Sequence, residues 1–352
     1  MKNTHLCNIL FIAPVLLCSA HSVFGQDTTA AKGKFSGEMY FDYFYNIEQM
    51  DSSKKDLQGF QLRRVYFTYD YAIARNFDTR LRLEVDQNTL TSNNKIGEFV
   101  KEAFLQWKNI FPGSDLITGL SATPTWFVSE DAWGYRSLEK TIMDFHGISV
   151  RTDLGVDLKG KITHDGVVNY FLKIGNNSGQ SPETDKFKRY YGMLHFKFTP
   201  SVQATAYADF DAEDKTLDAY DGLSKNNHRI LFAGFINYHE EANYSLGLEG
   251  FYRIMQNNYQ PSAAYPLQNQ NVYGVSAFGW VSAGDNVRLI GRFDVYDPNT
   301  SADKDGSSYF LTAVDYMPVK EVHVMPNFYV QSFQADVASD VVARMTFYYT
   351  FK

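Results

Sequence analysis

The chain has 352 residues, including 24 Tyr, 28 Phe and 4 Trp, and a formal charge of -7 at neutral pH. This aromatic content excludes an intrinsically disordered chain, which is poor in aromatic residues. Mean hydropathy is mildly negative, at -0.32. A polar chain with scattered aromatics cannot be a bundle of membrane-spanning helices, which needs runs of about 18 or more apolar residues. We expect no nucleic-acid partner, because the net charge of the chain is negative and no basic tract is present.

Residues 1–25 have the pattern of a secretory signal peptide. Lys2 supplies the positive start, residues 6–17 form a short apolar core, and a small-residue cleavage site follows. Both cysteines of the chain, Cys7 and Cys18, lie in this segment. The sequence therefore predicts an exported protein without disulfides. A lipoprotein signal that uses Cys18 is the alternative.

The chain alternates between apolar and polar residues from residue 35 onward. In FDTRLRLEVD, residues 77–86, the apolar side chains and Thr79 fall on one side and the charged ones on the other. A period of two residues predicts a strand with one apolar and one polar face. We expect sixteen such strands, at 35–46, 60–72, 77–88, 98–108, 115–122, 147–158, 167–176, 188–198, 201–210, 228–238, 242–254, 271–282, 286–296, 307–317, 320–331 and 339–351.

Strand length and spacing favour a membrane barrel over a secreted β-sandwich, which would also alternate. The strands are long, and about 9 to 11 tilted residues cross a hydrocarbon layer. Tight turns, as at 74–76 and 199–200, alternate with long polar stretches. This asymmetry predicts an all-β, 16-stranded antiparallel transmembrane barrel at 35–352, after a short extension at 26–34. Such barrels lie in the bacterial outer membrane, with short turns in the periplasm and long loops outside.

Several stretches are similar to a known family of outer-membrane channels. FQLRRVYFTYDY at 60–71, RLRLEVD at 80–86, GVDLKGKI at 155–162 and YFLKIGNNSG at 170–179 resemble segments of the phosphate-selective porin O and P family. The resemblance implies a 16-stranded, usually trimeric outer-membrane channel. It also implies an inward-folded loop and cationic residues along the route.

Strand parity places charges of both signs toward the lumen. A charge on the lipid-facing side costs about 2–4 kcal/mol at mid-depth, so the fold itself demands this placement. Arg80 and Arg82, about 7 Å apart along one face, are the predicted selectivity pair. Nearby Asp78 and Glu84 argue against a purely anionic preference. The expected pore-lining residues are Arg64, Arg80, Arg82, Glu84, Asp86, Arg151, Lys173, Arg189, Arg253, Arg288, Arg292 and Arg344.

Arg63 falls on the opposite parity from Arg64, near the outer end of its strand. We expect it to face lipid and to bind a lipopolysaccharide phosphate.

The long stretch at 122–147 is too apolar for a freely solvated loop. Leu138, Ile142 and Phe145 are spaced as one helical face. We expect this loop to fold into the lumen and narrow it. The alternative is a loop folded over the barrel end or into a trimer contact. The expected constriction residues are Trp126, Trp133, Arg136, Glu139 and Lys140.

The stretch at 209–221 contains six acids and one Lys. Clustered oxygen ligands could bind calcium, but the spacing of an EF-hand is absent, so we expect a solvated, self-repelling loop. We expect no metal or cofactor. No pattern of a nucleophile with its base is present, since His146 and Ser149 would lie on opposite faces of a strand. We therefore expect no enzymatic activity.

The function that the sequence supports best is a passive outer-membrane channel for small hydrophilic solutes, with an anion preference as the finer expectation. The expected partners are outer-membrane lipid, lipopolysaccharide, small solutes or anions, and two further copies in a homotrimer. The alternative is a barrel with an occluded lumen whose long loops serve adhesion or binding.

Overall fold

The computed structural model describes residues 33–240 and 243–352. The predicted signal peptide at 1–25, and the extension at 26–34 except for its last two residues, lie outside the described residues. No helix in the described part is long and apolar enough to cross a membrane.

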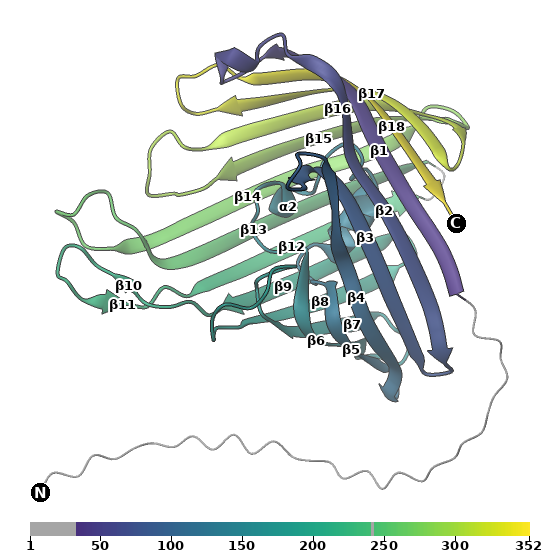
Figure 1. Cartoon of the computed structure of the whole chain (residues 1–352), viewed down its shortest axis with the longest axis horizontal. Helices are drawn as coiled ribbons and strands as arrows, with labels where there is room; N and C mark the ends of the chain where they lie inside the picture. The colour runs from purple at the N-terminus through teal and green to yellow at the C-terminus, as the bar shows by residue number, and fades with distance from the viewer. Residues whose placement is uncertain (1–32, 241–242) are drawn as a thin grey trace, which may run out of the picture. The chain divides into compact units, whose positions relative to one another are not determined.

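Sixteen antiparallel strands form a closed barrel in which neighbours along the chain pair with each other and β1 closes on β18 (Figure 1). This confirms the predicted fold class. The strands are β1 (Gly33–Glu48), β2 (Gln58–Ala74), β3 (Phe77–Leu90), β4 (Ile96–Phe111), β5 (Ser114–Ala122), β6 (Thr152–Lys161), β7 (Val168–Gly175), β8 (Arg189–Thr199), β9 (Val202–Asp211), β12 (Arg229–Glu240), β13 (Tyr244–Tyr259), β14 (Gln268–Ser282), β15 (Val287–Asp297), β16 (Ser307–Val319), β17 (Val322–Phe333) and β18 (Asp340–Phe351).

The outward face of the strands is apolar. Leu81, Leu246, Leu248 and Phe293 occupy alternate positions of their strands and are exposed. Exposing such side chains to water costs about 25 cal/mol of free energy for each Å² of apolar surface. An apolar band on the outside of a closed barrel is the arrangement that hydrocarbon stabilises.

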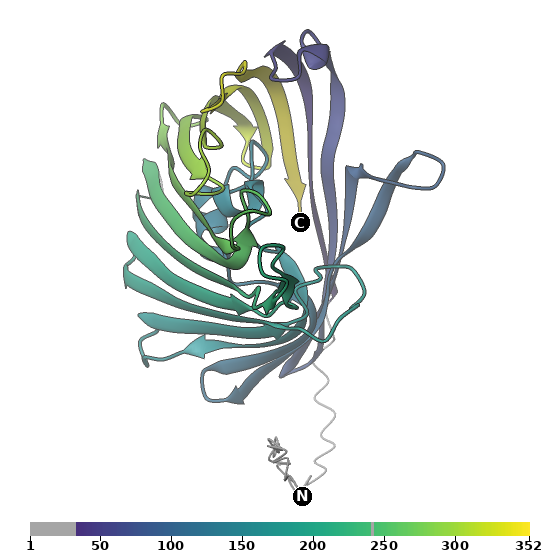
Figure 2. The ribbon, with the colours of Figure 1, turned by 90° about the vertical axis from the view of Figure 1, so that its left-hand side faces the viewer.

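The loop between β5 and β6, residues 123–151, lies inside the ring of strands (Figure 2). It carries two short helices, α1 (Phe127–Trp133) and α2 (Ile142–Phe145). Gly134 ends α1 in the left-handed conformation, with a φ of 67°, which glycine adopts without steric cost. The loop packs into one buried cluster with the wall. Its members include Trp126, Val128, Trp133, Leu138, Ile142 and Ile148 from the loop, and Tyr191, Leu231, Phe251, Phe278, Leu311 and Met325 from the wall.

The strand expected at 147–158 begins only at Thr152. Ile148 and Val150 alternate as in a strand, but Ile148 is buried in the core of the loop. The backbone N–H of Ile148 donates to the carbonyl of Met143, which holds it in the loop. The expected boundary was wrong because an apolar side chain in this loop packs inward against the loop itself.

The expectation that Arg63 faces lipid is wrong. The pairing of β1 with β2 shifts by one residue between Tyr40 and Phe41, where Arg64 and then Leu62 are the partners and Arg63 is the extra residue. Such a β-bulge re-aims side chains. Arg63 turns inward, where it forms an ion pair with the buried Asp42 and donates to the carbonyl of Leu138 at 3.0 Å. Two consecutive arginines therefore point into the barrel.

The loop after β9 is also more ordered than expected. It contains a hairpin of β10 (Thr216–Leu217) and β11 (Ser224–Lys225). Asp218 is fully buried and accepts hydrogen bonds from Gln260 Nε2 at 3.1 Å and from the backbone N–H of Leu267 at 3.2 Å. The prediction of a solvated, self-repelling loop is wrong at Asp218, because its carboxylate joins this loop to the next one. Within residues 33–240 and 243–352, no group of three or more His, Cys, Asp or Glu is arranged to hold a metal ion.

Candidate functional site: the lumen and its inward loop

Three arginines of the wall fix the middle of the inward loop by its backbone. Arg63 of β2 and Arg344 of β18 donate to the carbonyl of Leu138, at 3.0 and 2.9 Å. Arg292 of β15 donates to the carbonyl of Lys140. Guanidinium groups have five donors and stay charged, so each can hold a carboxylate or amide of the wall and still bind the loop. Asp294, which accepts from Arg292 at 2.6 Å, is one such wall partner.

Trp133 anchors the apolar side of the loop. Its side chain is 1% exposed, and its ring lies edge-on to Phe278 of β14 at 5.3 Å between centroids. The indole Nε1 donates to the carbonyl of Glu139 at 2.8 Å, so its polar atom is also satisfied. Nearby, the hydroxyl of Tyr135 donates to Asp315 at 3.0 Å. Together with the buried cluster, these contacts place the loop against the wall from β8 through β9 and β12 to β18.

A series of ion pairs connects the other side of the loop to β3 and β4. Glu102 lies near three guanidinium groups, those of Arg80 at 3.4 Å, Arg82 at 3.3 Å and Arg151 at 3.9 Å. Arg151 pairs in turn with Glu130 of α1 at 2.5 Å. Because Glu102 belongs to the wall and Glu130 to the loop, the series crosses the gap between them.

The series continues within the loop, where Arg136 pairs with both Glu130 and Asp144. Burial disfavours the charged form of Glu130, but Arg151 and Arg136 outweigh it and hold the pKa of Glu130 below its ordinary value. Burial likewise opposes the charge on Asp144, yet Arg136 and Lys140 hold the pKa of Asp144 below its ordinary value. Both acids are therefore ionised at neutral pH, and the series alternates in sign.

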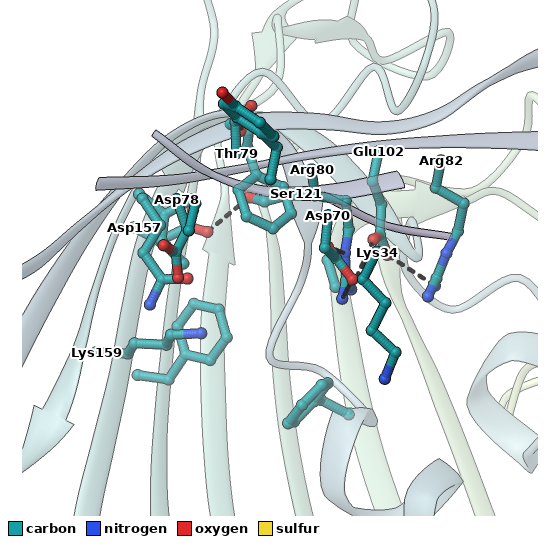
Figure 3. A pocket seen from close by; sticks show the side chains of 18 of the residues that line it. Lys34, Asp70, Asp78, Thr79, Arg80, Arg82, Glu102, Ser121, Asp157 and Lys159 are labelled. Atoms are coloured by element: carbon teal, nitrogen blue, oxygen red, sulfur yellow. Dashed lines mark hydrogen bonds and ion pairs between the residues drawn. The ribbon is translucent and has the colours of Figure 1, made fainter. Parts of the chain in front are cut away.

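The main cavity lies between the loop and β2 to β7, on the side of the short turns, and its volume is about 590 Å³ (Figure 3). Arg80 and Arg82 both point toward Glu102 in this view. Its acids are all engaged: Asp70 by Arg80 at 2.7 Å, Asp78 by Lys108 and Asp157 by Lys173, both at 2.8 Å, and Glu102 as described above. The charged residues on its lining are Lys34, Asp70, Asp78, Arg80, Arg82, Glu102, Arg151, Asp157 and Lys159.

A smaller cavity of about 210 Å³ lies beside the loop on the side of the long loops. Tyr40, Gln87 and Asn88 are among its uncharged residues. Its charged lining consists of Arg63, Arg64, Asp86, Arg136, Glu139, Lys140 and Arg344.

The structure divides the expected pore-lining residues into four groups. Arg80, Arg82 and Arg151 line the main cavity, and Arg64, Asp86 and Arg344 line the smaller one. Four others are buried in ion pairs rather than open to a cavity, because the loop or neighbouring wall side chains cover them: Glu84, Lys173, Arg189 and Arg292. Arg288 stacks on the ring of Trp280, with its guanidinium 3.8 Å from the centroid, and Arg253 lies on β13 near Arg189 and Arg229.

The expected constriction residues all belong to the inward loop, but they differ in what they contact. Trp126 and Trp133 are buried against the wall, whereas Glu139 and Lys140 line the smaller cavity. Arg136 also lines that cavity. Sequence reasoning missed Glu130, which connects wall and loop, because a loop has no strand periodicity and its partner Arg151 lies 21 residues further along the chain.

Known structures share this architecture. The channel DcaP of Acinetobacter baumannii is similar with a TM-score of 0.66 and 14% identity, over 91% of this chain and 97% of that one. An anion-selective porin from Comamonas acidovorans has a TM-score of 0.65 and 10% identity, over 91% and 100%. OmpT of Vibrio cholerae, an outer-membrane protein in a trimer form, has a TM-score of 0.60 and 11% identity, over 92% and 100%.

No protein-family model matches the chain, and comparison with curated proteins gives no match. The structural likeness establishes the fold, a closed 16-stranded barrel of the kind found in bacterial outer-membrane porins.

Acid is expected to loosen the inward loop. His146, at the end of α2, stacks on Tyr296 of β15 with centroids 3.6 Å apart. Burial lowers the pKa of His146 to about 4; Arg292 acts in the same direction, and Asp294 opposes it. A loop released into water would regain the ordinary value of about 6.5. As the pH falls from 6.5 to 4, His146 binds a proton when the loop is released into water but not when the loop is packed against the wall. The packed conformation therefore loses stability.

We therefore expect the backbone amides of residues 142–148 to exchange hydrogen faster, relative to their intrinsic rates, at pH 5 than at pH 7.5. His146→Gln should remove this part of the pH response. His164→Gln, in the exposed turn between β6 and β7, is the matched control and should leave it unchanged. An identical pH response in wild type and His146→Gln would contradict the prediction.

Proposed function

We propose that this protein is a passive diffusion channel for small hydrophilic solutes in the outer membrane of a Gram-negative bacterium. The observation that carries the proposal is the division of the lumen. The inward loop packs against the wall from β8 to β18, and a cavity of about 590 Å³ remains along β2 to β7. Charged side chains on a water-filled wall select solutes by the local field they create.

A mild preference for anions is the finer part of the proposal. The acids of the main cavity are engaged by cations, so they attract a passing cation weakly. The resemblance to phosphate-selective porins includes Arg63 and Arg64, but these arginines are held by Asp42 and by Glu84. That engagement supports a preference for anions in general over specific capture of phosphate. One similar structure is itself described as an anion-selective porin.

The proposal extends to the assembly. We infer a homotrimer in contact with outer-membrane lipid and lipopolysaccharide. Support comes from the apolar outward face and from the trimer form of the similar OmpT.

Planar bilayers under a salt gradient test the proposal. We expect discrete conductance steps and a reversal potential on the anion side. Arg80→Gln combined with Arg82→Gln leaves Glu102 and Asp70 less compensated, so the reversal potential should shift toward cation selectivity. Arg75→Gln with Lys320→Gln removes two cations from exposed short turns and is the matched control. Absence of conductance steps would contradict the channel, and an unchanged reversal potential would exclude Arg80 and Arg82 from the conducting path.

A further inference from the structure

A second cavity adjoins the main one on the side of the short turns. Its volume is about 310 Å³, and its lining includes Gly113, Lys161 and Lys197. Three residues line both cavities and so mark the place where they meet: Phe127, Lys159 and Phe171. We call these three residues the junction.

Phe127 is the exposed aromatic residue of the inward loop. It is 54% exposed, while the adjacent Trp126 and the nearby Trp133 are buried. The Phe127 ring at the start of α1 contributes most of the apolar surface here, and Phe171 of β7, which is 7% exposed, adds a small area from the wall. Covering a ring of this size with an apolar ligand would be favourable, at about 25 cal/mol for each Å² removed from water.

Lys159 of β6 supplies the charge of the junction. Within residues 33–240 and 243–352 its ammonium forms no ion pair. Asp115 lies opposite it on β5, but that carboxylate accepts from Gln106 Nε2 at 2.7 Å and from the backbone N–H of Asn109 at 2.9 Å. Asp157, two residues away, pairs with Lys173 at 2.8 Å.

The arginines differ from Lys159 in this respect. Arg80 is held by Asp70 and Glu102, and Arg82 donates to Thr68 at 2.9 Å and pairs with Glu102. In Figure 3, Lys159 extends apart from the Asp70–Arg80–Glu102 group. The Lys159 ammonium can therefore donate hydrogen bonds to a solute at the junction. Most of the N–H donors of Arg80 and Arg82 already bind wall residues.

We propose that the junction is a binding subsite for small organic anions with an aromatic or other flat apolar body, such as an aromatic carboxylate. The carboxylate pairs with the Lys159 ammonium, and the ring is covered by Phe127 and Phe171. Offset or edge-to-face contact between aromatic rings adds about 0.5–1.5 kcal/mol beyond burial. A compact inorganic anion would use Lys159 alone. This inference rests on the proposed channel function, because it names the solute class that the channel retains longest.

The test is block of the chloride current through the full-length protein in planar bilayers. Benzoate, acetate and inorganic phosphate are the three probes. We expect benzoate to block at concentrations about 3- to 10-fold lower than acetate, which corresponds to one favourable aromatic contact. Phe127→Ser should raise the half-blocking concentration of benzoate by a similar factor and leave that of acetate unchanged. Lys159→Gln should weaken block by both carboxylates.

Two controls match these variants. Tyr220→Ser removes a similarly exposed aromatic residue from an outer loop, and Lys197→Gln removes a cation from the second cavity outside the junction. Neither should change the ratio of benzoate to acetate block. If benzoate and acetate, or benzoate and phosphate, had equal half-blocking concentrations, the proposed subsite would be wrong. The proposed channel function would not be affected by that result.

A wild-type protein without conductance would overturn the channel instead. In that case, calorimetric titration of the purified barrel with benzoate decides the subsite. Binding that Phe127→Ser weakens would support it, and no binding would overturn it.

Discussion

Replacing Trp133 by alanine is expected to raise single-channel conductance. The side chain is buried between the inward loop and Phe278, and its indole N–H bonds the loop backbone at Glu139. Removing a buried Trp costs about 3–5 kcal/mol. The change destabilises the packing of the loop on the wall but not the barrel itself. The loop should therefore be detached from the wall for a larger fraction of the time. Larger steps in planar bilayers would record the wider lumen.

Trp107→Ala is the control for this prediction. Trp107 lies on β4 with an exposed outward side chain and contacts Phe77, not the loop. Its removal should leave conductance unchanged. Far-UV circular dichroism must show an intact barrel in both variants. A folded Trp133→Ala protein with wild-type conductance would mean that Trp133 does not hold the loop in place.

Replacing Glu102 by glutamine is expected to give the largest change in ion selectivity. Glu102 is buried and is shared by Arg80, Arg82 and Arg151. Glutamine keeps the shape but removes the charge, which leaves the three guanidinium groups less compensated. A unit charge at 4 Å is worth about 1 kcal/mol even in bulk water, which corresponds to about fivefold in a permeability ratio. The reversal potential under a salt gradient should shift toward anions.

Glu98→Gln is the matched variant, because it removes the same charge from an exposed position of the same strand. It should shift the reversal potential little. Glu102→Gln and the double change of Arg80 and Arg82 should move the potential in opposite directions. A shift in the same direction for both would contradict the ion-pair series as the origin of selectivity.

The sequence was informative wherever the signal is local. Alternation with period two defined the strands, since successive side chains of a strand point to opposite faces. It also predicted the sixteen-stranded barrel, which the structure confirms. The apolar content of residues 122–147 predicted that this loop needs a surface to cover. The structure shows it packed against the inner wall.

The sequence was not informative where a shift of one residue in strand register, or a partner far along the chain, decides which way a side chain faces. Arg63 faces inward because a bulge interrupts the parity of β2, and nothing in the alternating pattern marks the extra residue. Ile148 alternates like a strand residue and yet belongs to the loop core. The junction of Phe127, Lys159 and Phe171 was also missed, because these residues come from a loop and two different strands.

The amino-acid sequence by itself therefore determined the class of fold, the apolar and polar faces of the strands, and the presence of charges of both signs inside. Only the tertiary structure decided which of those charges are engaged and which half of the lumen stays open. The reason is distance along the chain: Arg344 donates to Leu138 across 206 positions, and Tyr135 to Asp315 across 180. Such pairings depend on barrel closure and loop packing, which no local pattern encodes.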